Sequence, residues 1–244
     1  MEKLKDKSVD LVLTDPPYII SRKTGMDALF NSQDKSKAKY GKKYAIQTDY
    51  GKWDSQFTID TLDKFIGEFY RVLKPGGSCI IFFDLWKIET LSNLLTSHKF
   101  SKIRFIEWIK TNPVPINSKA TYLSNSREIA VSCVKGGKAT FHSEYDNGIY
   151  KYPIYQGKRD VDRIHPTQKS LELFEDLINK HSNKDDIVLD PFGGSATTYI
   201  ACQRTQRKCY SAEIDESYYK KSIERINWHD NNKTPNQSFF EHSS

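Results

Sequence analysis

The stretch Asp186-Ile187-Val188-Leu189-Asp190-Pro191-Phe192-Gly193-Gly194-Ser195 decides the fold class of this chain. Its first seven residues, mostly apolar, predict a short buried strand. The two glycines predict an abrupt turn, in which small residues let a ligand approach the backbone closely. Residues 196–204 are compatible with a helix, which Ser195 or Thr197 is expected to cap. Taken alone, this pattern is equally typical of a plain connection between a strand and a helix.

Similar strands and helices alternate along the rest of the chain. β-branched and aliphatic runs predict strands at 9–15, 78–84, 103–110, 128–134 and 208–215. Apolar residues at helical spacing predict helices at 62–73, about 87–98 and 171–178, the first of them ended by Lys74-Pro75-Gly76-Gly77. This alternation predicts an α/β fold with a doubly wound, mostly parallel, Rossmann-like sheet.

An acidic residue lies at or near the end of each of four predicted strands: Asp15, Asp84, Asp190 and Glu213. Ligands of such sheets bind at the carboxyl ends of the strands. Glu213 follows the glycine turn by about 20 residues, a spacing that suits a carboxylate accepting both hydroxyls of a ribose. A single acidic residue at such a position is more often a solvated strand end.

The tetrapeptide Asp15-Pro16-Pro17-Tyr18 follows the first predicted strand. An aromatic amine is a poor nucleophile until hydrogen-bond acceptors draw on its N–H protons, and the Asp15 carboxylate and the Pro16 carbonyl are two candidate acceptors. The two prolines restrict the turn, so the acceptors would be aimed before the reaction begins. Tyr18 is a candidate for stacking on a base taken out of a duplex. The alternative is a strand-ending turn with an aromatic residue packed beneath it.

The chain has 244 residues, a net charge of +6 and the composition of a globular protein. Apolar runs long enough for a membrane span and a signal-peptide pattern are both missing, so we expect a cytoplasmic protein without a membrane partner. The four cysteines lack metal-binding spacing and are expected to be reduced structural thiols, with no metal site. Residues 229–244 predict a polar tail.

Much of the positive charge falls between residues 21 and 52, a segment that contains eight basic and three acidic side chains. Residues 19–53 lack clear periodicity and predict a mobile basic loop. Contact with nucleic-acid phosphates is one interpretation, and a solvated lysine-rich loop is the other. The candidate phosphate-binding residues are Lys35, Lys37, Lys39, Lys42 and Lys43.

Together these segments resemble the amino-methyltransferases of DNA, specifically the permuted class often called beta, in which the catalytic motif precedes the cofactor motif. That family has a D/S-P-P-Y segment, a target-recognition insertion, H-P-T-Q-K, D-P-F-x-G-S-G-T-T and an acidic strand end, in this order. Here the corresponding segments are 15–18, about 111–163, 165–169, 190–198 and Glu213. The resemblance also includes Gly51-Lys52-Trp53-Asp54, Lys74-Pro75-Gly76-Gly77 and residues 108–113.

The resemblance implies a circularly permuted methyltransferase sheet and a single domain that transfers a methyl group from S-adenosylmethionine to DNA. Asp15 would bind the target amine and touch the cofactor, and Tyr18 would stack on the flipped base. Aspartate rather than serine at position 15 favours adenine N6 over cytosine N4. A homodimer and a cognate restriction endonuclease are candidate partners. The residues that would hold the cofactor are Asp15, His165, Thr167, Lys169, Asp190, Phe192, Gly193, Gly194, Ser195 and Glu213.

Two departures from the family pattern leave other functions open. Ala196 replaces a usual glycine, and the strand expected upstream of Asp15 is missing, so either the open reading frame starts upstream or the sheet lacks one edge strand at the N-terminus. A nucleic-acid-binding pseudoenzyme is therefore an alternative to the enzyme. The permuted order of the motifs disfavours methylation of RNA or of protein glutamine. The absence of the G-x-G-x-x-G fingerprint disfavours a nicotinamide dehydrogenase.

Overall fold

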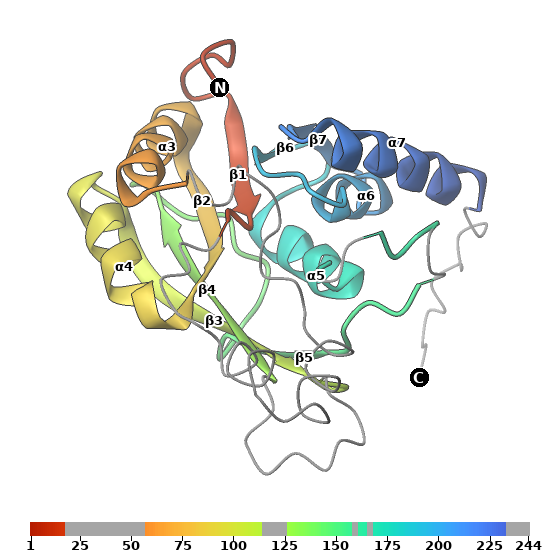
Figure 1. Cartoon of the computed structure of the whole chain (residues 1–244). Coiled ribbons are helices and arrows are strands. Elements are labelled where there is room, and N and C mark those ends of the chain that lie inside the picture. Colours follow the sequence, from red (N-terminus) through yellow and green to blue (C-terminus); the bar gives the residue numbers. More distant parts are fainter. Residues whose placement is uncertain (18–56, 114–125, 158–160, 165–167, 233–244) are drawn as a thin grey trace, which may run out of the picture.

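The computed structural model describes residues 1–17, 57–113, 126–157, 161–164 and 168–232. Figure 1 shows the chain with its elements labelled. In chain order they are β1 (Val9–Thr14), α3 (Ile59–Val72), β2 (Leu73–Phe83), the short 3-10 helix η2 (Leu85–Lys87), α4 (Ile88–Ser97), β3 (Ser101–Lys110), β4 (Arg127–Val134), β5 (Ile149–Tyr152), α5 (Leu171–His181), β6 (Ile187–Asp190), α6 (Thr197–Arg204), β7 (Lys208–Ser211) and α7 (Glu216–Asn231).

A seven-stranded sheet with the order β5-β3-β4-β2-β1-β6-β7 forms the centre of the molecule. β1 pairs in parallel with β2 and β6, and β6 pairs in parallel with β7. β4 runs antiparallel between β2 and β3, while β5 pairs in parallel with β3. The predicted mostly parallel α/β sheet is thus confirmed, and β7 and β5 form its two edges among the described residues.

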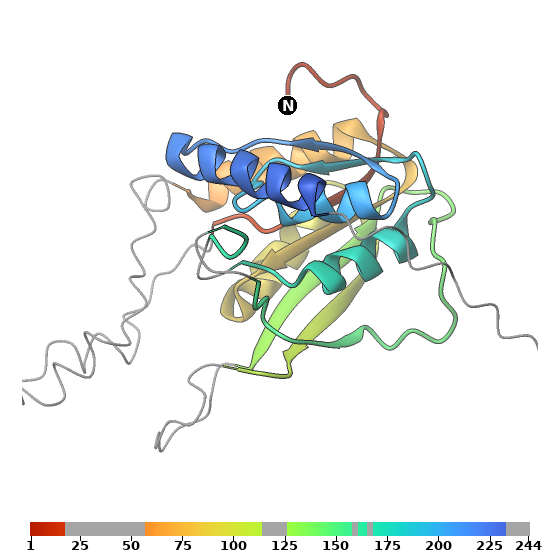
Figure 2. The same cartoon turned by 90° about the vertical axis from the view of Figure 1, so that its right-hand side faces the viewer.

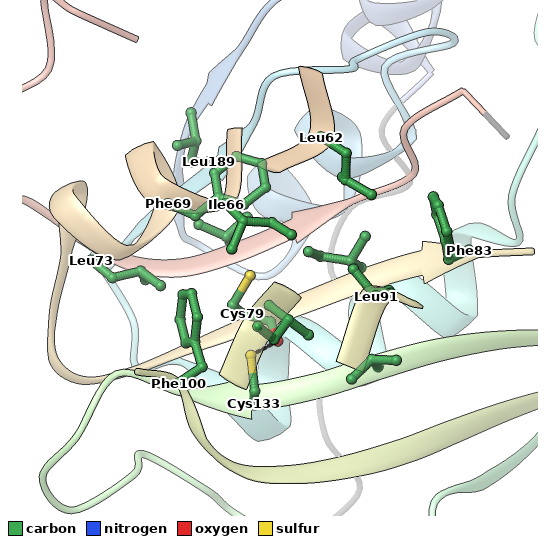
Figure 3. Packing of buried hydrophobic residues seen from close by; sticks show 14 of the residues in the cluster. Leu62, Ile66, Phe69, Leu73, Cys79, Phe83, Leu91, Phe100, Cys133 and Leu189 are labelled. Atoms are coloured by element: carbon green, nitrogen blue, oxygen red, sulfur yellow. Dashed lines mark hydrogen bonds between the residues drawn. The ribbon is translucent and has the colours of Figure 1, made fainter. Parts of the chain in front are cut away.

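Helices cover both faces of the sheet, with α3 and α4 on one and α5, α6 and α7 on the other (Figures 1 and 2). Each face has its own apolar core because neighbouring residues of a strand point to opposite sides. Cys79, Ile81 and Phe83 of β2 pack toward α3 and α4, as Figure 3 shows for Cys79 and Phe83, whereas Ile80 and Phe82 pack toward α5. Because the strands are buried on both faces of the sheet, their sequences are continuous apolar runs.

The four cysteines are free thiols, as predicted. Cys79 and Cys133 lie opposite each other on β2 and β4, where the Cys133 thiol contacts the Cys79 carbonyl oxygen at 3.6 Å (Figure 3). Burial raises the pKa of the Cys79 thiol well above its ordinary value. In the described part of the chain, no helix combines the length and apolar character that a membrane crossing requires.

Three features differ from the predicted elements. The segment Lys74–Gly77 was expected to end a helix, but it forms the irregular beginning of β2. Gly76 has a positive φ of 87°, and a Cβ there would lie 2.3 Å from the carbonyl oxygen of Lys138, so the backbones approach too closely for a side chain. β5 and α7 were not predicted, because β5 lies in a polar stretch and buries only one of its four residues, and because the apolar periodicity of α7 is weak.

Three segments predicted from composition lie wholly or partly outside the described residues. The basic loop of residues 19–53 and its lysines are among them. Of the polar tail predicted at residues 229–244, residues 233–244 lie outside the described residues, whereas residues 229–231 form the end of α7, so the predicted start of the tail is wrong. The interval 111–163 is described in part. It contains β4, which is central in the sheet, and the edge strand β5, so these two parts of the interval belong to the sheet. Its role in target recognition stays a prediction.

Candidate active site

The four acidic residues predicted at strand ends lie at one edge of the sheet, because β1, β2, β6 and β7 all run in the same direction. Asp15 follows the last residue of β1, and Asp190 is the last residue of β6. Asp84 follows β2, and its carboxylate accepts a hydrogen bond from the Trp86 amide at 3.1 Å, which caps η2. The predicted position of these residues at or near the carboxyl ends of the strands is confirmed.

The glycine turn after β6 is joined directly to Glu213. The Gly194 amide donates to Glu213 Oε2 at 2.8 Å, and the Asp215 amide donates to Glu213 Oε1 at 2.8 Å. Among the described residues, a Cβ on Gly194 would meet only the Phe192 carbonyl oxygen, at 3.9 Å, so no described side chain closes this side of the turn. The structure therefore orients the Glu213 carboxylate beside a turn whose surface is bare backbone.

Ala196 is the N-cap of α6 and has φ 61° and ψ 28°, in the left-handed region. This conformation costs an L-residue about 1–2 kcal/mol, whereas glycine adopts it without that cost. Neither Ser195 nor Thr197 caps the helix, so that prediction is wrong. The side chains of Ser195 and Thr197 instead contact each other, with 3.1 Å between their hydroxyl oxygens.

Asp190 is a buried carboxylate that joins three segments. It accepts hydrogen bonds from the Thr14 hydroxyl at 2.7 Å, the Thr198 hydroxyl at 2.5 Å and the Phe192 amide at 3.1 Å. Burial raises the pKa of Asp190 to about 6, although these hydrogen bonds act in the opposite direction. The carboxylate thus fixes the end of β1, which carries Asp15, to the glycine turn and to α6.

Asp15 lies in a chain of alternating charges. Lys169 Nζ is 2.8 Å from Asp15 Oδ2 and 2.7 Å from Glu128 Oε2, and Lys110 Nζ is 2.7 Å from Glu128 Oε1. Burial tends to raise the pKa of Glu128, but the charges of Lys169 and Lys110 outweigh it and hold this pKa below its ordinary value. Lys169, predicted to close over a cofactor, is therefore placed beside the proposed reacting group.

Five other predicted site residues lie in, or directly beside, parts of the chain outside the described residues. Pro16 and Pro17 follow Asp15 as a short irregular segment, whereas Tyr18, His165 and Thr167 lie outside the described residues. The N-cap of α5 is Ser170, directly after Lys169.

The ring of Phe192, in the glycine turn, packs against two aromatic residues. Its centroid lies 4.7 Å from that of Phe65 and 5.4 Å from that of Phe57. Gly193 is equally confined, because a Cβ there would lie 2.3 Å from the Ser211 hydroxyl oxygen. The apolar core and β7 thus hold the turn from both sides.

A buried polar cluster, which the sequence did not reveal, supports the glycine turn from α7. Arg225 is fully buried and donates to the Ser195 carbonyl oxygen at 2.6 Å and to Asp162 Oδ1 at 3.1 Å. His229 Nε2 lies 2.7 Å from the same Asp162 oxygen, and the Tyr155 hydroxyl donates to Asp162 Oδ2. Burial tends to raise the pKa of Asp162, but hydrogen bonds from His229, Tyr155 and Arg225 outweigh it and lower this pKa.

Comparison with known proteins is consistent with this geometry. The model of a family described as DNA methylase matches residues 9–225. The Type II methyltransferase M2.LlaDCHI of Lactococcus lactis subsp. cremoris is 28% identical over 243 residues, covering 93% of this chain and 85% of that protein. M2.DpnII of Streptococcus pneumoniae is 28% identical with the same coverage. The crystal structure of the M1.HpyAVI–SAM complex superposes with a TM-score of 0.65 at 27% identity, covering 93% of this chain and 91% of that one.

Proposed function

The chain belongs to the DNA methylase family, and on this premise we propose that it transfers a methyl group from S-adenosylmethionine to the N6 of adenine, at a specific DNA sequence, after base flipping. The observation that carries the proposal is the position of Asp15. Its carboxylate is held by the Lys169 ammonium at 2.8 Å and lies at the same sheet edge as Glu213 and the glycine turn. A carboxylate that can accept hydrogen bonds from the target amine and a surface that can bind a nucleoside thus lie at the same edge of the sheet.

The chemistry of an amine acceptor fits Asp15. An aromatic amine becomes a better nucleophile when acceptors take hydrogen bonds from its N–H groups, and an ionised carboxylate is a strong acceptor. Asp15 is kept beside a cation, which favours its ionised form. The Pro16 carbonyl is the proposed second acceptor, and the adjoining prolines restrict how far either acceptor can move.

The residues around the glycine turn fit S-adenosylmethionine. Each Glu213 oxygen accepts one backbone hydrogen bond and keeps a second lone-pair direction for a ribose hydroxyl. The side of Gly194 that no described side chain closes allows close approach of the ligand to the backbone. When bound, the cofactor supplies an electrophilic methyl group on a sulfonium. We further propose that His165 and Thr167 contribute to the same site, while Asp190 acts by holding the turn.

The DNA-facing parts of the proposal rest on sequence. Residues 111–163 outside β4 and β5 are proposed to recognise the target sequence, and Tyr18 to stack on the flipped base. The lysines between residues 35 and 43 are proposed to contact phosphates. Replacing Lys35, Lys37 and Lys39 with alanine should then reduce the slope of log affinity against log salt concentration. An unchanged slope would reject their phosphate contact.

The partners and location proposed for the chain extend the same function. Both curated relatives are named Type II methyltransferases, so we include a restriction endonuclease of the same specificity in the proposal. We also include a homodimer and a cytoplasmic location. Sedimentation of the purified protein tests the dimer, and protection of methylated DNA against endonucleases of known specificity tests the partner.

The central experiment is incubation of the full chain with labelled S-adenosylmethionine and mixed-sequence DNA, followed by nucleoside analysis. Label in N6-methyladenine is the expected result, because position 15 is aspartate. Label in N4-methylcytosine would keep the enzyme class but overturn the base assignment. No transfer, together with no calorimetric binding of S-adenosylmethionine at millimolar concentration, would leave the nucleic-acid-binding pseudoenzyme.

A further inference from the structure

Glu128 has no assigned role, yet in the largely buried chain of charges only Lys169 separates it from Asp15. Both of its oxygens are engaged, Oε1 by Lys110 and Oε2 by Lys169, each at 2.7 Å. Its side chain is 16% exposed and that of Lys169 is 7% exposed. Few water molecules can therefore replace either partner, so the loss of one charge would leave its partner poorly compensated.

We propose that Glu128 is a positioning residue for methyl transfer, which holds the Lys169 ammonium against the Asp15 carboxylate. This inference rests on the proposed function. A lysine side chain has four methylene groups and rotates freely unless its ammonium is fixed. Two carboxylates, those of Asp15 and Glu128, fix it here, and the ring of Phe82 lies 5.5 Å from the same atom.

The sheet itself holds Glu128 in position. β4 lies between β2 and β3, and Glu128 pairs with Trp108 of β3. Trp108 Nε1 donates to the Tyr152 carbonyl oxygen at 2.9 Å, and Asn112 accepts from the Ile154 amide at 2.6 Å. The residues at 108, 110 and 112 thus anchor β3 to the segment that contains β5, and they bring Lys110 to Glu128. Glu128 is consequently fixed before any ligand arrives.

The effect on Asp15 is electrostatic as well as geometric. Asp15 lies near a second carboxylate, since its charge contributes to raising the pKa of Asp190, after the larger effect of burial. The Lys169 ammonium opposes that repulsion at a distance of 2.8 Å from Asp15. Without Glu128, the Lys169 ammonium would lose one of the two carboxylates that fix it and would no longer be held in place against Asp15. We therefore expect a loss in kcat rather than in cofactor binding.

The test compares Glu128→Gln with Lys169→Met and with the double variant, in the full chain with DNA and S-adenosylmethionine. Glu128→Gln should lower kcat about 10- to 100-fold, within the range of positioned proton-transfer and orientation effects, and change the calorimetric Kd for S-adenosylmethionine less than about threefold. The double variant should be no slower than Lys169→Met alone, because Glu128 acts through Lys169. Multiplicative losses in the double variant, or an unchanged kcat in folded Glu128→Gln, would overturn the proposal.

A matched control is Glu107→Gln on the neighbouring strand. Glu107 forms a more exposed pair with Arg127 at 3.5 Å and lies outside the chain of charges, so this variant should retain the wild-type kcat. If Glu128→Gln fails to fold, the double variant Glu128→Gln/Lys110→Met replaces it, because this variant removes one charge of each sign and leaves no uncompensated lysine at position 110. It should show the same loss in kcat, because Lys169 has lost the same anchor; an unchanged kcat would reject the proposal.

A crystal structure of the same variant gives a readout that does not depend on turnover. In folded Glu128→Gln, Lys169 Nζ should leave its position between the two carboxylates. A structure in which Nζ stays at about its present place beside Asp15 Oδ2 would overturn the positioning role even if the enzyme proved inactive. Inactivity of the wild-type protein would instead reject the proposed function, so the two failures can be told apart.

Discussion

Asp15 and Asp190 are alike in sequence and opposite in environment. Each stands at the end of a buried strand, each precedes a proline, and β1 and β6 are parallel neighbours. Asp15 has a side chain that is 26% exposed and is paired with the Lys169 ammonium. Asp190 is 4% exposed and is surrounded by two hydroxyls and a backbone amide.

The partner decides what each carboxyl group can do. A cation beside Asp15 favours the ionised form that accepts hydrogen bonds from an amine. Neutral donors compensate the burial of Asp190 only in part, so its pKa is raised to about 6. We therefore interpret Asp15 as the group that faces the reaction and Asp190 as the group that joins the catalytic and glycine turns.

The largest expected effect is the loss of catalysis on Asp15→Asn. This change keeps the size of the side chain but removes the anion, so kcat should fall by more than about 100-fold, as for other groups that act directly on a reacting proton. Transfer of labelled methyl groups to DNA measures it. The control is Asp84→Asn at the neighbouring strand end, where asparagine can still cap η2. A comparable loss of kcat in both variants would mean that Asp15 has no special role in methyl transfer.

The next effect is on stability and concerns Asp190→Asn. The pKa of Asp190 is raised in the folded protein, so the folded state binds the proton more tightly than the unfolded state does. The protonated carboxyl group therefore adds to the free energy of unfolding at low pH, and this contribution is lost as the pH rises through about 6. Two pKa units correspond to about 3 kcal/mol as an order of magnitude. The free energy of unfolding of the wild type should therefore decrease relative to that of Asp190→Asn between pH 4 and 7.5. Urea unfolding at several pH values measures this difference, and a constant difference would contradict it.

A smaller effect is expected for Thr198→Val, which removes one donor to the Asp190 carboxylate. Hydrogen bonds to charged groups contribute about 1.5–3 kcal/mol, so the free energy of unfolding should fall by about that amount at pH 7.5. The effect should shrink at pH 4, where Asp190 is protonated. Thr205→Val at the other end of α6 is the control, because its hydroxyl binds only carbonyl oxygens. Equal, pH-independent losses in both variants would argue against a special role of the carboxylate.

The smallest effect is expected for Ala196→Gly. Glycine relieves the left-handed conformation, but the unfolded chain gains entropy and a buried methyl group is lost, so the net change in stability should be within about 1 kcal/mol. Affinity for S-adenosylmethionine should improve slightly if the turn relaxes toward the ligand. Calorimetric titration measures this, and a weaker affinity would show that the alanine methyl group supports the site.

Much of the fold and the outline of the site followed from local patterns. Apolar runs predicted the central strands β1, β2, β4 and β6, because a strand buried on both faces has to be apolar throughout. Residues 73–77 were misread because Pro75 and two glycines are typical of turns, whereas here they begin a strand whose backbone lies against Lys138. α7 was overlooked because its buried side chains include the polar residues Arg225 and His229.

The sequence by itself determined the order of the motifs, the parallel sheet and the edge at which Asp15, Asp190 and Glu213 gather, because these depend on short-range periodicity and on strand direction. It did not determine which aspartate is paired with a cation, nor that Glu128 joins two lysines at the site. Thr14 and Asp190 are separated by 176 positions, and Lys169 reaches Asp15 from the segment just before α5. Only the tertiary structure decided these partners, because the charge and burial of a carboxyl group depend on residues that folding brings together from distant parts of the chain.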